Sequence, residues 1–253
     1  PGPGRGRLHS DGGYAVRNPL GLLSGDAAKR AVRAGSAQSL AGGAVAFSLI
    51  EMLTPGMDGI DSTIAPVCDG MDELSSLTAP RPTFAGIDLS RAVLMGVVNV
   101  TPDSFSDGGD FFDRDAAIDR ALKHADDGAA IVDIGGESTR PGAEQMTVAE
   151  EIARVVPVIE AALAAGITVS VDTRRAAVMT AAIEAGAAIV NDITALAGDP
   201  AAMEIVAKSG ASVILMHMQG TPETMQQAPD YRLASVDIYR WLSDRVEACV
   251  VAG

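Results

Sequence analysis

The sequence predicts an α/β fold, a (β/α)8 TIM barrel of which this chain contains about the first five β/α units. From Arg91 onward, short continuous apolar runs alternate with amphipathic segments. This pattern is typical of strands buried on both faces of a parallel sheet and of the helices that connect them. In addition, every apolar run closes with a polar residue, which indicates a common site at one end of the strands.

The strands and helices of this region are expected in alternation along the chain. The predicted strands are Ala92 to Val100, Ala129 to Gly136, Ile167 to Thr173, Ala187 to Ile193 and Ala211 to Met218. Between them, apolar residues recur at helical spacing, as in Ile118, Ala121, Leu122, Ala125 and in Ile152, Val155, Val156, Ile159. The segments therefore predict repeated β/α units.

Local signals mark where these helices begin and end. Thr147 followed by Glu150 has the form of a capping box, and Asp199 before Pro200 suits an N-cap and a first helical position. Glycines precede the later strands at the position where a left-handed helix stop is favoured. These glycines are Gly128, Gly166, Gly186 and Gly210.

A doubly wound sheet and a barrel both explain alternating strands and helices. The polar residues at or near the ends of the five runs are Asn99, Asp133, Asp172, Asn191 and His217. A doubly wound sheet binds its ligand at one switch point and needs such groups on only a few strands. A barrel brings the carboxyl end of every strand to one mouth, so the pattern favours a barrel.

The first 85 residues are interpreted as an N-terminal extension, partly disordered and partly helical, before a barrel domain over residues 86–253. Pro1 to Gly13 contains little that could be buried and is predicted to be disordered. Leu20 to Leu53 is rich in Ala and Leu and is predicted to be helical, and its apolar part, Leu40 to Leu53, is interpreted as a buried helix. Thr54 to Pro82 reads as a loop, so no strand series is expected here.

Composition excludes several kinds of partner. The formal charge of −14 argues against nucleic acid and anionic membrane, because phosphate binding depends on clustered Lys and Arg. The longest apolar stretch is shorter than the roughly 20 residues that a bilayer crossing requires. Cys68 and Cys249 form neither a disulfide framework nor a metal-ligand spacing. A reducing cytoplasm and small-molecule partners fit this composition.

Two polar, Gly-containing loops follow the first two strands, NVTPDSFSDGG at residues 99–109 and GGESTRPG at residues 135–142. Taken alone, each is more simply read as a solvated turn. Both, however, follow strands whose carboxyl ends meet at the same mouth. Together they indicate a binding site in which the backbone of both loops can come close to an anion.

These loops and the later strings SVDT, IVNDI and LMHMQGTPETMQ resemble the successive motifs of bacterial dihydropteroate synthases from about Leu94 to the C-terminus. The resemblance implies a transferase of folate biosynthesis and a sulfonamide target. In its reaction the amine of p-aminobenzoate displaces pyrophosphate from the methylene carbon of 6-hydroxymethyl-7,8-dihydropterin pyrophosphate. It further implies Mg2+ as cofactor, with a homodimer as one option for assembly.

The resemblance assigns the departing pyrophosphate to the metal and to residues of the two loops. Asn99 is implied as the Mg2+ ligand, which suits a cation that prefers oxygen donors. Thr139 is implied as a pyrophosphate or pterin contact and Arg140 as a catalytic cation beside the anion. Asp107 could stabilise positive charge at the methylene carbon. Without the resemblance, Asn99 would be read as a backbone cap and Arg140 as a surface residue.

The pterin ring presents donors beside acceptors, and a carboxylate matches that edge. By resemblance Asp172 and Asn191 bind the ring, while Asp133 has a supporting role. The plain alternative for Asp172 is a cap on the following helix. His217 is interpreted as a packing residue rather than a general base.

The resemblance also indicates where p-aminobenzoate binds. Phe105, Ser106 and Pro141 are the candidates, since an aromatic ring and a proline form a flat apolar slot. Each of these residues alone would more simply be explained by loop packing.

The family's later motifs, a DPG strand, a Lys loop and an Arg-His pair, are not found in this sequence. We therefore expect a C-terminally truncated dihydropteroate synthase that is inactive on its own. A non-catalytic pterin-binding protein remains an alternative. So does another pterin-using barrel, such as a methyltetrahydrofolate methyltransferase, although the two loop strings fit it less well.

Overall fold

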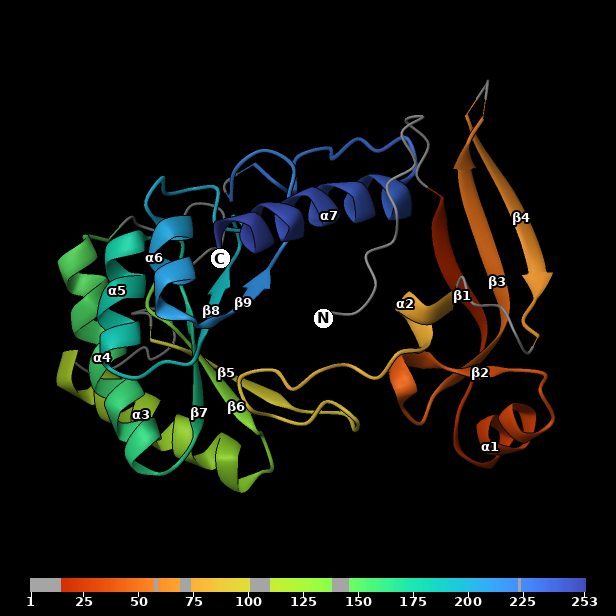
Figure 1. Cartoon of the computed structure of the whole chain (residues 1–253). Helices are drawn as coiled ribbons and strands as arrows, with labels where there is room; N and C mark the ends of the chain where they lie inside the picture. Colours follow the sequence, from red (N-terminus) through yellow and green to blue (C-terminus); the bar gives the residue numbers. More distant parts are fainter. Residues whose placement is uncertain (1–14, 57–58, 69–73, 101–109, 138–145, 223) are drawn as a thin grey trace. The chain divides into compact units, whose positions relative to one another are not determined.

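The computed structural model describes residues 15–56, 59–68, 74–100, 110–137, 146–222 and 224–253 (Figure 1). The chain divides into two units, the first formed by Pro1–Ala92 with Leu233–Tyr239 and the second by Val93–Arg232 with Arg240–Gly253. The predicted disorder of Pro1 to Gly13 lies outside the described residues. Within them, no helix is long and apolar enough to cross a membrane.

The second unit contains one parallel sheet, and its five strands pair in chain order. They are β5 (Met95–Asn99), β6 (Ile131–Gly135), β7 (Thr168–Asp172), β8 (Ile189–Asp192) and β9 (Ser212–Leu215). Each lies inside one of the five predicted apolar runs. This confirms the predicted β/α pattern as a partial (β/α) barrel.

Helices alternate with these strands and pack on one face of the sheet (Figure 1). They are α3 (Asp110–Asp126), α4 (Val148–Ala164), α5 (Ala176–Glu184) and α6 (Ala202–Ser209). A further helix, α7 (Ala234–Ala252), follows β9. The core between sheet and helices consists of aliphatic side chains such as Val98, Ile134, Val171, Val158 and Ile159, all 0% exposed. Burial of each such side chain stabilises the fold by roughly 1.5–3 kcal/mol.

The helix boundaries largely follow the sequence signals. The Thr147 hydroxyl accepts from the Glu150 N–H at 3.2 Å and the Glu150 carboxylate accepts from the Thr147 N–H at 2.8 Å, which confirms the capping box. Gly128 has a φ of +98°, as expected for a helix stop. The prediction for α6 is wrong by two residues. Asp199 caps a turn by accepting from the Ala201 N–H at 3.0 Å, and the helix begins after it.

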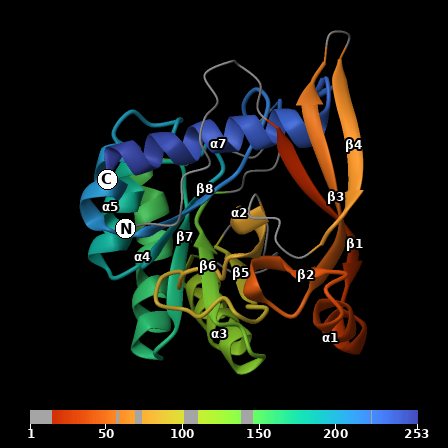
Figure 2. The same cartoon turned by 45° about the vertical axis from the view of Figure 1, so that its right-hand side comes forward.

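The first unit contains an antiparallel sheet that the sequence did not reveal (Figures 1 and 2). Its strands are β1 (Val16–Leu23), β2 (Gln38–Ser39), β3 (Ala46–Pro55) and β4 (Ile60–Pro66). The helical elements are α1 (Gly25–Arg33), the 3-10 helix η1 (Leu40–Gly42) and α2 (Ser75–Thr78). β3 is the central strand, since β1 pairs along one edge and both β2 and β4 along the other.

The prediction of a helical segment over Leu20 to Leu53 is therefore wrong outside α1 and η1. The expectations of a buried helix from Leu40 to Leu53 and of no strand series in the first 85 residues are wrong as well. The reason is the spacing of the buried residues in β3, because Phe47, Ile50 and Leu53 recur at every third position and imitate a helix. Phe47 and Ile50 pack in one cluster, whereas Leu53 packs in another with Val16. The strand contacts different clusters along its length, so its buried residues do not alternate with exposed ones as they do in most strands.

This sheet predicts a stability difference between two of its apolar side chains. Phe47 is fully buried, so Phe47→Ala should destabilise the protein by about 3–5 kcal/mol. Ile64 on β4 is 56% exposed, and Ile64→Ala should change stability by less than about 0.5 kcal/mol. Denaturant unfolding of both variants checks this. Equal effects would contradict the assignment of a core to the first unit.

Candidate functional site

The register of the parallel sheet places four residues in one row at the carboxyl ends of the strands. Asn99 pairs with Gly135, Gly135 with Asp172, and Asp172 with Asn191. Residues paired across neighbouring strands project from the same face. Because the adjacent residue Val171 faces the helices, this row faces the opposite side, which is the barrel interior.

Gly135 leaves a space between two oxygen-bearing side chains. A methyl group on Gly135 would lie 3.5 Å from Asn99 Oδ1 and 3.6 Å from Asp172 Oδ2. The two oxygens therefore border the same small volume above β6. A metal ion, or a group that donates hydrogen bonds to both oxygens, could reach this volume without a side chain in between.

Asp133 lies one layer below this row and orients Asn191. Asp133 Oδ2 accepts from Asn191 Nδ2 at 2.9 Å. Since a carboxylate accepts and does not donate, the Asn191 NH2 group must face Asp133, which leaves the Asn191 carbonyl oxygen available as an acceptor. Asp133 is 3% exposed, and its Oδ1 has no hydrogen-bond partner, like the buried hydroxyl of its cross-strand neighbour Ser170.

The pKa of Asp172 is raised to about 7. Burial is the main cause, followed by the nearby carboxylates of Asp133, Asp192 and Glu151. Asp172 thus ionises near neutral pH, and its carboxylate is held in an environment that disfavours its charge. Perturbation of this kind is typical of binding and catalytic carboxylates, which makes Asp172 the centre of the candidate site.

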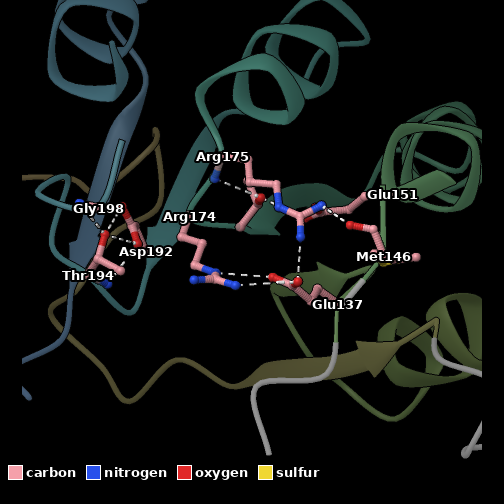
Figure 3. Close-up of polar contacts among 9 residues, drawn as sticks. Glu137, Met146, Glu151, Arg174, Arg175, Asp192, Thr194 and Gly198 are labelled. Carbon is pink, nitrogen blue, oxygen red and sulfur yellow. Dashed lines mark hydrogen bonds and ion pairs between the residues drawn. The ribbon is translucent and has the colours of Figure 1, made fainter. Parts of the chain in front are cut away.

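Asp192, at the end of β8, stabilises the turn behind the row (Figure 3). It is fully buried, and its carboxylate accepts from the Thr194 N–H at 2.7 Å and the Leu196 N–H at 2.9 Å. These bonds hold Ala195 and Leu196 at positive φ, a conformation that side chains disfavour. From α7, Arg245 donates to the Ala195 carbonyl at 3.0 and 2.7 Å.

Two arginines after β7 form a second polar network beside the row (Figure 3). Arg174 Nε lies 3.1 Å from Glu137 Oε2, and Arg175 Nη2 lies 2.5 Å from Glu137 Oε1. Arg175 Nη1 is 3.1 Å from Glu151 Oε2. Glu151 is fully buried, and burial is the main cause that raises its pKa, although the Thr173 hydroxyl and Arg175 oppose this shift.

The structure brings together those predicted site residues that it describes. Asn99, Asp172 and Asn191 share the row, and Asp133 supports Asn191. His217 packs its ring against Trp241, with centroids 5.0 Å apart, in agreement with its reading as a packing residue. The remaining predicted residues lie outside the described part of the chain. They are Phe105, Ser106, Asp107, Thr139, Arg140 and Pro141.

Sequence reasoning missed Glu151 and its arginine partner. Glu151 occupies the buried stripe of α4, because Val155, Val158 and Ile159 follow it at i+4, i+7 and i+8. A carboxylate on an apolar helix stripe needs a polar partner, so the position of Glu151 in the sequence already indicated a buried ion pair or hydrogen bond. The partner, Arg175, could not be identified from spacing, because it is distant in sequence.

No group of three or more His, Cys, Asp or Glu side chains arranged to hold a metal occurs among the described residues. Mg2+ does not require one, since it keeps several waters and uses one or two protein oxygens together with substrate phosphates. The Asn99 and Asp172 oxygens beside Gly135 are donors of the right type. The row therefore fits a hard divalent cation bound partly by its substrate.

Comparison with known families defines the class of this chain. A family model described as "Pterin binding enzyme" matches residues 95–253, more than half of the sequence. The chain therefore belongs to the pterin binding enzyme family.

Among its relatives are dihydropteroate synthases. That of Escherichia coli K12 is 46% identical over 172 residues, which cover 66% of this chain and 59% of the relative. A structure of Yersinia pestis dihydropteroate synthase with a sulfonamide drug complex has a TM-score of 0.60 at 50% identity, covering 66% of this chain and 61% of that one. The Burkholderia cenocepacia enzyme complexed with 7,8-dihydropteroate has a TM-score of 0.57 at 40% identity, covering 66% and 56%. The chain thus spans about three fifths of these proteins.

Asp172 predicts a pH dependence of stability. Its pKa is raised on folding from 3.8 to about 7, so between these values the folded state binds more protons than the unfolded state. Stability should therefore fall as pH rises from about 4 to about 7. The contribution is at most about 1.4 kcal/mol per pH unit, and less here because Asp172 is only partly buried.

Asp172→Asn should remove this slope and raise stability at pH 8 relative to wild type. Urea unfolding at several pH values measures it. Asp88→Asn is the control. Local hydrogen bonds from Ser90 lower the pKa of Asp88, so the titration of Asp88 affects stability only below about pH 4. An unchanged slope in Asp172→Asn would contradict the assigned burial of charge.

Proposed function

We propose that the protein containing this chain is a dihydropteroate synthase. In the proposed reaction the nitrogen of p-aminobenzoate forms a bond to the methylene carbon of 6-hydroxymethyl-7,8-dihydropterin pyrophosphate. The carbon–oxygen bond to pyrophosphate breaks, and the amine loses a proton. The row Asn99, Gly135, Asp172 and Asn191 at the mouth of a pterin binding enzyme's barrel is the observation that carries this proposal.

Pterin recognition is assigned to two adjacent acceptors. The Asp172 carboxylate and the Asn191 carbonyl oxygen stand on neighbouring strands, and Asp133 fixes the Asn191 amide in this orientation. The amino-pyrimidinone edge of a pterin presents N–H donors that match them. Hydrogen bonds to a charged partner contribute roughly 1.5–3 kcal/mol each, enough to orient the ring. Pairing with these donors would also favour the ionised form of Asp172.

Asn99 is proposed as the protein ligand of Mg2+, with the Asp172 carboxylate close to the same space. When bound there, the cation would reduce the cost of the negative charge that develops on pyrophosphate. Arg140 and Thr139 are proposed to contact the same anion, on the basis of the motif GGESTRPG. Asp107 is proposed to stabilise positive charge at the methylene carbon.

Phe105, Ser106 and Pro141 are proposed to bind p-aminobenzoate. Support comes from their motifs and from the relatives, since sulfonamide and dihydropteroate complexes are known for similar synthases. An aromatic ring beside a proline suits a flat arene.

The experiment that tests this function is product formation by the full-length natural protein that contains this chain. Asp172→Asn should lower kcat/KM for the pterin substrate by about a hundredfold or more, because a charged acceptor is replaced and one pterin donor is left poorly matched. Asp88→Asn in the first unit should leave kinetics unchanged. If the wild-type protein binds 6-hydroxymethylpterin in calorimetry but forms no dihydropteroate, the alternative of a non-catalytic pterin-binding protein holds instead.

The metal assignment has its own test. Asn99→Ala should weaken binding of the pyrophosphate substrate in the presence of Mg2+ by at least about tenfold, since an oxygen ligand is lost. Binding of 6-hydroxymethylpterin, which lacks pyrophosphate, should stay within about threefold of wild type. Calorimetric titration with and without Mg2+ compares the two ligands. If Mg2+ strengthens binding of the pyrophosphate substrate to Asn99→Ala as much as to wild type, Asn99 is not the metal ligand.

A further inference from the structure

Glu151 is a buried carboxylate that no step of the proposed reaction uses. It is 0% exposed and belongs to the buried stripe of α4. Burial of a charge in such a place costs free energy unless the charge is paired. Even when it is paired, a buried ion pair gains little stability over a well-packed apolar pair, because desolvation offsets the attraction of the charges. Stability alone therefore explains Glu151 poorly, and its contacts indicate another role.

The stem of the Glu151 side chain lies against the end of β6. Gly136 directly follows Gly135, a member of the row. A methyl group on Gly136 would lie 3.0 Å from Glu151 Cγ and 2.9 Å from Val155 Cγ1, distances at which carbon atoms overlap. Glu151 thus approaches the Gly136 backbone more closely than a residue with a side chain would allow. Since Glu151 and Val155 belong to α4, this contact is on the helix side of the sheet, behind the row.

The carboxylate of Glu151 reaches the end of β7. Its Oε1 accepts from the Thr173 hydroxyl at 2.7 Å. Thr173 is 5% exposed and directly follows Asp172, and its N–H donates to the Asn191 carbonyl at 3.0 Å. The Thr173 hydroxyl also accepts from the Arg175 N–H at 3.2 Å. Thr173 is therefore held through its backbone and its side chain at once.

One side chain of α4 thus contacts the residue after Gly135 and the residue after Asp172. The second oxygen of Glu151, Oε2, lies 3.1 Å from Arg175 Nη1, which orients the carboxylate (Figure 3). Gly135 and Asp172 are paired across β6 and β7, and the space beside Gly135 is bordered by Asp172 Oδ2. The shape of the row therefore depends on how the ends of these two strands are held.

We propose that Glu151 is a positioning residue for pterin binding, which joins the ends of β6 and β7 from the helix side so that Gly135 and Asp172 keep their places in the row. This inference rests on the pterin site of the proposed function. Glu151 acts through Gly136 and Thr173 and does not touch the ligand. Its role requires an acceptor oxygen for the Thr173 hydroxyl, which a carboxylate and an amide both provide.

The test requires a variant that loses this link without leaving a buried polar group unpaired. Thr173→Val alone leaves Glu151 Oε1 without its donor and should lower the unfolding midpoint. The informative protein is the double variant Thr173→Val/Glu151→Met in the full-length natural protein. Replacing both partners of a buried hydrogen bond by apolar groups is nearly neutral for stability, and Arg175 keeps Glu137 and the Met146 carbonyl. The double variant should regain most of the wild-type unfolding midpoint.

Affinity for 6-hydroxymethylpterin is measured by calorimetry well below the unfolding midpoints, so that every variant is folded. It should fall at least about tenfold in the double variant, because small displacements of binding groups weaken a site strongly. Glu151→Gln keeps the acceptor and Thr173→Ser keeps the hydroxyl, so each should stay within about threefold of wild type.

The matched control is Thr180→Val. The Thr180 hydroxyl donates to the Ala176 carbonyl at 3.0 Å within α5, so this variant removes a hydroxyl of the same kind that does not join the strand ends. Its affinity for 6-hydroxymethylpterin should change by less than about twofold.

A double variant with wild-type pterin affinity would overturn the proposal and make Glu151 a structural residue. A loss in Glu151→Gln as large as that in the double variant would also overturn it, since the charge rather than the hydrogen bond would then be required. Because binding is measured without turnover, a wild-type protein that binds the pterin but forms no dihydropteroate would reject the synthase function, while this comparison still decides the role of Glu151. A wild-type protein that binds no pterin would overturn both.

Discussion

The parallel register of β5 to β9 is the constraint on which the candidate site depends. It brings Asn99, Gly135, Asp172 and Asn191 into one row, although these residues are separated by long connections in the sequence. The row faces away from the helices because residues alternate along each strand. Asp133 supports this row from one layer below, and the networks of Asp192 and of Arg175 hold the chain just beyond it.

Gathering acidic groups in this place has an electrostatic cost, which the neighbouring networks limit in different ways. The Asp192 charge is met by N–H groups of its own turn, and Asp133 receives the Asn191 amide. Glu151 is compensated by Arg175 and Thr173. Asp172 has the least compensation, which agrees with its raised pKa. Asp172, the carboxylate proposed to bind the pterin, is thus the one whose charge a ligand could still compensate.

The second unit was predictable from sequence because its signals are local. Apolar runs, the capping box at Thr147 and the glycine at Gly128 each determine structure within a few residues. The sheet of the first unit was not predictable, since the buried positions of β3 reflect contacts with several distant segments. In the site, strand-end residues such as Asp172 were identifiable. The pairing of Arg175 with Glu137 and Glu151 depends on tertiary proximity and carries no signature of spacing.

Gly135 has a consequence for how sequence variation in this protein would be read. A methyl group there would make only ordinary contacts, the nearest at 3.5 Å, so Gly135→Ala would leave folding and expression close to normal. The methyl group would nevertheless occupy the space between Asn99 and Asp172. A survey that scores variants by abundance or melting temperature would therefore record Gly135→Ala as neutral. Only a survey that measures ligand binding would detect the effect of this substitution.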